Sequence, residues 1–138
     1  VLAVVLVVSM PIRRFDDILH RDFAPANKLE WEVAMKVREM AGDGALIVTV
    51  GAYSIHKGGV DVSPVLYRYA NARGWSLIGT NWSAADVEVL RGKGAALLVG
   101  IKLDREPSTK HMVQKLTDHY RKIWRGKDSL ILDLQGPR

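Results

Sequence analysis

Two kinds of apolar pattern alternate along the chain from residue 28 onward. In the first segment, apolar residues recur every three or four positions among charged ones, at Leu29, Val33, Val37 and Met40. This spacing predicts an amphipathic helix that ends near Gly42. Residues 45–50 (ALIVTV) follow as a short, β-branched apolar run between two glycines, which is typical of a strand buried on both faces.

A second helix and strand repeat this order. Ser63 is the expected N-cap and Pro64 the first helical residue, with Gly74 as the expected stop. The inward face of this helix is predicted to carry Val65, Leu66, Tyr69 and Ala70. Residues 75–78 should then form a short strand.

The remaining chain continues the alternation. Ser83 and Asp86 have the spacing of a helix cap, and Val87 and Leu90 give that helix an apolar side before a buried strand at residues 95–101. A last helix is expected to open at Ser108 or Thr109, with an apolar side formed by Met112, Val113, Leu116, Tyr120, Ile123 and Trp124. Residues 130–134 (LILDL) close the pattern as a strand.

Strands that alternate with helices of this length predict an α/β domain. The expected sheet is small and mainly parallel, with about four strands and with helices packed on its faces. In such sheets ligands bind at the carboxyl ends of the strands, so a functional site is expected at that edge.

The chain begins with an uncharged apolar run. Residues 1–12 (VLAVVLVVSMPI) precede Arg13 and Arg14, and as a helix the run would cover only about 18 Å, whereas a membrane span needs about 20 residues. We therefore expect residues 1–14 to be the end of a truncated transmembrane helix, residues 15–27 a linker and residues 28–138 a soluble α/β domain. The alternative is a buried strand at residues 1–8, because five of these eight residues are valine.

Composition narrows the function classes only slightly. The net charge is +5, but basic and acidic residues are interspersed, so no nucleic-acid-binding stripe is indicated and anionic membrane headgroups are the favoured charged partner. The chain has no cysteine, which excludes disulfides, thiolate metal sites and cysteine nucleophiles.

One connection has the residues and position of a ligand-binding loop. Residues 51–63 (GAYSIHKGGVDVS) leave the carboxyl end of the first strand, and they contain Tyr53, His56, Lys57 and Asp61, which could bind a sugar or phosphate. The same residues also fit an ordinary surface loop, and no nucleotide-binding glycine pattern is present.

Other catalytic and metal-binding patterns are not found. The four histidines, His20, His56, His111 and His119, are widely separated, and no serine lies in a nucleophile-elbow motif. We therefore predict no catalytic residue, no metal site and no cofactor in this chain. The aromatic residues Tyr67, Tyr69 and Trp75 are expected to fill the space between helix and sheet rather than to stack on sugars.

The segment around these aromatic residues carries a resemblance to a known family. Residues 29–134 resemble the extracytoplasmic C-terminal domain of bacterial polytopic glycosyltransferases related to dolichyl-phosphate-mannose protein mannosyltransferases and to the aminoarabinose transferases of lipid A. The matching residues are Pro64, Leu66, Tyr67, Tyr69, Ala70, Arg73, Gly74 and Trp75. The chain departs from the sequence motif of that family, because Arg68 lies between Tyr67 and Tyr69.

The resemblance implies transfer of a sugar from a polyprenyl-phosphate donor to an acceptor at the outer side of the cytoplasmic membrane. The catalytic carboxylates of that family lie in an early loop outside this chain, so the implied role here is accessory and non-catalytic, next to the rest of a polytopic membrane protein. Two alternatives stay open. One is a membrane-tethered module that binds a small polar ligand, and the other is a complete soluble α/β protein of unknown role.

Overall fold

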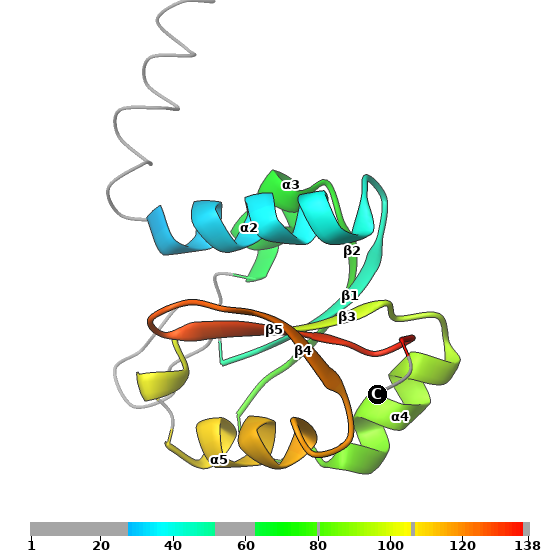
Figure 1. Cartoon of the computed structure of the whole chain (residues 1–138), viewed down its shortest axis with the longest axis vertical. Helices are drawn as coiled ribbons and strands as arrows, with labels where there is room; N and C mark the ends of the chain where they lie inside the picture. Colours follow the sequence, from blue (N-terminus) through cyan, green and yellow to red (C-terminus); the bar gives the residue numbers. More distant parts are fainter. Residues whose placement is uncertain (1–27, 52–62, 80, 106, 137–138) are drawn as a thin grey trace, which may run out of the picture.

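The computed structural model describes residues 28–51, 63–79, 81–105 and 107–136. These residues form helices on both sides of a single mixed sheet (Figure 1). The elements are α2 (Lys28–Ala41), β1 (Leu46–Val50), α3 (Ser63–Ala70), β2 (Arg73–Leu77), α4 (Ala84–Gly92), β3 (Leu97–Ile101), the 3-10 turn η2 (Leu103–Arg105), α5 (Pro107–Leu116), β4 (Arg121–Arg125) and β5 (Ser129–Asp133).

The sheet has five strands in the order β2-β1-β3-β5-β4. β1 pairs in parallel with both β2 and β3, whereas β5 is antiparallel to β3 and β4 is antiparallel to β5. The connection from β1 to β2 runs in one direction across the sheet, and the connection from β2 to β3 runs back. Since such crossovers share one hand, α3 and α4 must cover opposite faces.

The helices bury one apolar core on each face of the sheet. The α2/α3 core consists of Val33, Ala34, Val37, Ile47, Leu66, Ala70, Leu97, Val99, Ile101 and Ile131. The α4/α5 core on the other face includes Val48, Val50, Val87, Leu90, Leu98, Val113, Leu116, Leu130 and Leu132. Alternate residues of β1 and β5 therefore serve different cores, which explains why β1 is mostly apolar and why Leu130, Ile131 and Leu132 form an unbroken apolar run in β5.

Several sequence predictions are confirmed at residue level. The helix expected to end near Gly42 is α2, with Val33 and Val37 fully buried. The expected cap at Ser83 is present, because the backbone N–H of Ser83 donates to the Asp86 carboxylate at 2.7 Å and the Ser83 hydroxyl donates at 2.8 Å. Helices on the faces of a sheet, the general fold class, are likewise confirmed.

The expectation of about four, mainly parallel strands was met only in part. The sheet has five strands, and only two of its four pairings are parallel. The last helix was expected to reach Trp124, but α5 ends at Leu116 and residues 121–125 form β4. The spacing of Tyr120, Ile123 and Trp124 is compatible with a helix. The segment nevertheless forms a strand, because its backbone pairs with β5.

Gly74 was also misassigned as a helix stop. α3 already ends at Ala70, and Asn71 adopts the left-handed conformation (φ 48°) that commonly follows a helix. Gly74 instead lies within β2, where a Cβ atom would come within 1.8 Å of the Ile47 carbonyl oxygen. The glycine thus permits close pairing of β2 with β1.

No helix in the described ranges is long and apolar enough to cross a membrane. Residues 1–14, for which a transmembrane segment is predicted, and the linker at residues 15–27 lie outside those ranges. Their assignment stays a prediction.

Candidate functional site

The carboxyl edge of the parallel strands is the candidate site. The chain leaves the carboxyl end of β1 toward α3 on one face, and it leaves the carboxyl end of β3 toward α5 on the other, so the two connections diverge between β1 and β3. Open α/β sheets bind ligands at such a switch point, outside the carboxyl ends of the two strands. Here those ends are Val50 of β1 and Ile101 of β3.

Gly51 allows the chain to leave β1 close to β3. It has a positive φ of 79°, and a Cβ atom at this position would lie 2.5 Å from the carbonyl oxygen of Ile101. The predicted ligand residues come next in the chain, but Tyr53, His56, Lys57 and Asp61 lie outside the described residues. Their contact with a ligand stays a prediction.

A buried ion pair joins α2 to the end of β3 at this edge. Glu30 lies in the first turn of α2 and is only 1% exposed, while the Lys102 side chain, which directly follows β3, is 15% exposed. Lys102 Nζ forms an ion pair with Glu30 Oε1. The contact lacks ordinary hydrogen-bond geometry, since no described donor is aligned with that oxygen.

The backbone of Lys102 adopts an unfavourable conformation that places its side chain in the ion pair with Glu30. Lys102 has a φ of 55°, which is uncommon for a residue other than glycine and costs about 1 kcal/mol or more. Neither residue was predicted to have a role, because Glu30 is one of the charged residues between the apolar positions of the expected helix and Lys102 belongs to no recognised motif. The signal that could have found them was a single lysine directly after an apolar strand.

A basic cavity lies at the same edge, between η2, α5 and the β4–β5 hairpin. Its volume is about 120 Å³. The charged residues that line it are Asp104, Lys110, Lys122, Arg125, Lys127 and Asp128. With four basic and two acidic side chains, the lining carries a net charge of +2. The sequence did not indicate this cavity, because the last helix was expected to extend through Trp124, whereas Lys122 and Arg125 lie on β4.

The aromatic residues around α3 hold the β1–α3–β2 unit together. The Tyr67 hydroxyl donates to the Trp75 carbonyl oxygen at 2.6 Å and lies 3.3 Å from the Thr49 hydroxyl, which in turn donates to Ser76 at 3.0 Å. This network satisfies the buried Thr49 side chain. Tyr67 and Tyr69 pack against the α2/α3 core and Trp75 against the α4/α5 core, so the predicted packing role is confirmed.

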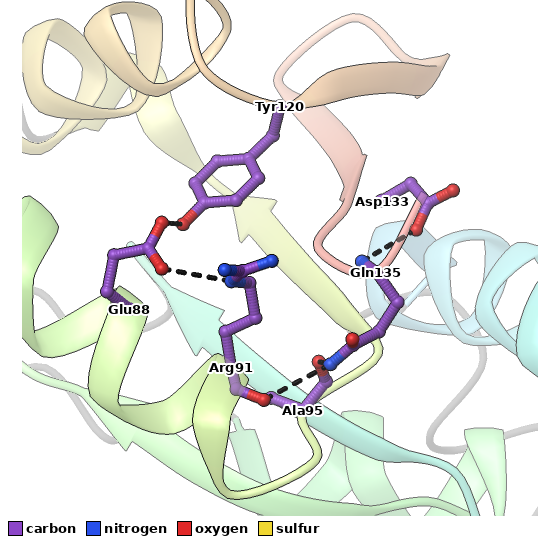
Figure 2. Close-up of polar contacts among 6 residues, drawn as sticks. All are labelled: Glu88, Arg91, Ala95, Tyr120, Asp133 and Gln135. Atoms are coloured by element: carbon purple, nitrogen blue, oxygen red, sulfur yellow. Dashed lines mark hydrogen bonds and ion pairs between the residues drawn. The ribbon is translucent and has the colours of Figure 1, made fainter. Parts of the chain in front are cut away.

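A second polar cluster lies at the opposite edge of the parallel strands (Figure 2). The Tyr120 hydroxyl, just before β4, donates to the Glu88 carboxylate of α4, and Arg91 Nε donates to Glu88 at 2.9 Å. The pKa of Tyr120 is raised to about 12, firstly by burial of the side chain and secondly by the Glu88 carboxylate. The pKa of Glu88 is lowered, chiefly by the hydrogen bond from the Tyr120 hydroxyl. Burial acts in the opposite direction, and Arg91 lowers the pKa further.

The segment after β5 completes this cluster. The Gln135 side-chain amide donates to the carbonyl oxygens of Arg91 and Ala95, at 3.1 and 2.9 Å (Figure 2). The Asp133 carboxylate accepts backbone N–H groups from Gln135 and Gly136. Burial alone would raise the pKa of Asp133, but these bonds and Arg121 lower it. The cluster ties α4 to the segment that follows β5, and all its polar contacts are made within the protein, so we assign it a structural role.

Replacing Tyr120 with phenylalanine should lower the free energy of unfolding at neutral pH by about 1 kcal/mol, because one hydrogen bond is lost. The raised pKa of Tyr120 means that the fold favours its protonated form. This contribution is complete below pH 10, the ordinary tyrosine value, and is lost as pH rises from 10 through about 12. Urea unfolding measured across that range should therefore show the wild type and Tyr120→Phe converging. If the difference in the free energy of unfolding between the two proteins stayed constant with pH, the loss of stability at alkaline pH would come from other groups.

No three histidine, cysteine, aspartate or glutamate side chains in the described part of the chain are grouped as a metal site. Comparison with known proteins adds no assignment, since no family model, no curated protein and no solved structure matches this chain.

Proposed function

We propose that this chain is the accessory, non-catalytic soluble domain of an integral-membrane glycosyltransferase, placed on the extracytoplasmic side of the membrane. The enzyme would move a sugar from a polyprenyl-phosphate donor to an acceptor. The first support is the resemblance around α3, described above.

The residues that carry the resemblance have fold-building roles. Gly74 allows β2 to pair closely with β1, and Tyr67 binds the backbone of Trp75. Neither feature performs chemistry. A motif that maintains a domain rather than a reaction fits an accessory role for this part of the enzyme.

The observation that carries the proposal is the position of the start of α2. The ion pair between Glu30 and Lys102 places it at the carboxyl edge of the sheet, where ligand sites of such folds occur. The segment that precedes α2 in the sequence, which includes the apolar residues 1–12, therefore joins the domain at its expected functional edge. This arrangement would turn that edge toward a membrane-embedded active site.

Trp31 adds a feature suited to a membrane surface. It lies in the first turns of α2, is 45% exposed and packs edge-on against Tyr69, with ring centroids 5.3 Å apart. Exposed tryptophan and tyrosine are enriched at membrane–water interfaces, because their rings are apolar with a polar tip.

The test compares three proteins in membrane vesicles with a polyprenyl-phosphate sugar and an acceptor. The first is the full product of the reading frame. The second is the same product ending directly before Lys28, so that it lacks the domain, and the third is the 138-residue chain alone. We expect transfer by the first, transfer reduced about tenfold or more in the second through loss of positioning, and none by the third. Transfer by the isolated chain, or an upstream frame without several membrane spans, would refute the proposal.

A membrane-tethered module that binds a small polar ligand is the second candidate. The basic cavity beside η2 favours it, because a domain that only covered an active site would not need such a cavity. An upstream frame with a single membrane anchor would select this candidate.

A further inference from the structure

The cavity between η2, α5 and the β4–β5 hairpin has the size and charge of an anion site. Its volume of about 120 Å³ is several times what one water molecule needs, so it can hold a phosphate group. Lys110, Lys122, Arg125 and Lys127 line it from the helix, the strand and the hairpin turn. Three separate elements thus bring their charges to one place.

A β-bulge in β4 aims two of these side chains at the cavity. Lys122 pairs with Leu132 and Arg125 pairs with Leu130, and both leucines belong to the α4/α5 core. Residues directly opposite in an antiparallel pair point to the same face, so Lys122 and Arg125 both face α5. Regular alternation would put residues three apart on opposite faces, and the extra residue at the bulge, Ile123, removes that difference.

The acidic residues of the cavity are already engaged. Asp104 forms an ion pair with Lys110, and the Asp128 carboxylate accepts the backbone N–H of Asp104 at 2.6 Å. By contrast, none of Lys122, Arg125 and Lys127 has an ion-pair partner among the described residues. Asp128 is the one lining carboxylate without an ion-pair partner among the described residues, so these three cations leave the cavity with a net positive charge that attracts an anion.

We propose that this cavity binds the phosphate group of an anionic ligand. Arg125 supplies the planar fork that binds phosphate oxygens in a bidentate way, and the two lysines add point charges. The phosphate can belong to a membrane-lipid headgroup or to a soluble phosphate compound. The site goes beyond the transferase assignment and stands or falls separately from it.

The experiment titrates the intact chain with two probes. Inorganic phosphate is added while the amide NMR signals of Gly126, Lys127 and Asp128 are followed, and co-sedimentation is measured with phosphatidylcholine vesicles with and without phosphatidylglycerol. The readout with vesicles is the increase caused by phosphatidylglycerol, so that binding by the apolar residues 1–12 cancels. We expect a saturable response that weakens with added salt.

The test variant is Lys122→Gln/Arg125→Gln, and the matched control is Lys93→Gln/Arg68→Gln. Both variants remove one lysine and one arginine, all four residues are exposed, and the control positions do not line the cavity. The test variant should bind about tenfold more weakly or worse, because each charged hydrogen bond contributes on that scale. The control should bind like the wild type.

The two probes separate the source of the phosphate. A specific loss with inorganic phosphate supports a soluble ligand, whereas a specific loss only with phosphatidylglycerol vesicles supports a lipid headgroup. No saturable binding to either probe, or equal binding by the test variant and the control, would overturn the proposal. A dispersed amide spectrum of the test variant verifies that it is folded.

Discussion

Replacing Gly74 with alanine should lower the free energy of unfolding by about 3 kcal/mol or more. The new Cβ atom would lie 1.8 Å from the carbonyl oxygen of Ile47 and 2.8 Å from its carbonyl carbon. Both atoms belong to the backbone of β1, so no side chain can move aside. The φ of 147° at Gly74 adds strain for any residue with a side chain. Relief requires β2 to separate from β1, which would also break the Thr49–Ser76 hydrogen bond.

Thermal and urea unfolding followed by circular dichroism would measure this loss. For a domain of this size, 3 kcal/mol corresponds to a Tm lower by more than about 10 °C. Gly92→Ala is the matched control, because Gly92 is the last residue of α4 and nothing lies within 4 Å of a Cβ atom there. The control should be neutral or slightly stabilising, since alanine favours helix. Equal stability of Gly74→Ala and wild type would contradict the close pairing of β1 and β2.

Replacing Lys102 with methionine should cost about 3–5 kcal/mol, because it leaves the Glu30 carboxylate buried without a counter-charge. Glu30 is 1% exposed, so water cannot replace the lost ammonium group without opening the carboxyl edge. Methionine keeps most of the volume of the lysine chain, which limits the loss from packing. Urea unfolding at neutral pH measures the effect.

A double variant separates the lost charge from lost packing. Glu30→Met/Lys102→Met removes both charges and should recover most of the stability, since a buried ion pair can often be replaced by apolar residues of similar volume. Lys36→Met is the control, because Lys36 pairs with Glu39 at an exposed position and should change stability by about 0.5 kcal/mol or less. A double variant as unstable as Lys102→Met alone would show that the buried charge is not the cause.

These two variants also probe the candidate site. Gly74 holds the β1–α3–β2 unit in place, and the Glu30–Lys102 pair fixes the start of α2 beside the end of β3. Both act on the geometry of the carboxyl edge rather than on a ligand. Loss of phosphate binding in either variant would therefore be accompanied by a loss of stability, whereas Lys122→Gln/Arg125→Gln should lose binding alone.

Local sequence patterns were sufficient for much of the fold. The three- and four-residue spacing of Leu29, Val33 and Val37 predicted α2, because one side of that helix must be apolar wherever it packs. The Ser83–Asp86 cap predicted the start of α4, because the capping bonds form between residues three apart. These signals depend only on near neighbours in the chain, so they do not require knowledge of the tertiary structure.

The same local patterns were ambiguous at the last helix. Tyr120, Ile123 and Trp124 fit a helical spacing, and the basic residues beside them suit a helix C-terminus. In the structure Ile123 and Trp124 lie in β4 and Tyr120 directly precedes it, because the backbone of β5 needs a partner on its outer side and the turn at residues 126–128 brings β4 there. A strand pairing depends on residues elsewhere in the chain, which a single window of sequence cannot reveal.

The sequence by itself thus determined the class of the fold, most of its elements and the edge at which a site was expected. Only the tertiary structure decided which side chains lie at that edge. Glu30 meets Lys102 because α2 and β3 pack together, and Lys122 and Arg125 face one cavity because a single bulge shifts the register of β4. Periodicity reports which residues avoid water, but the pairing of distant charges is set by packing and register.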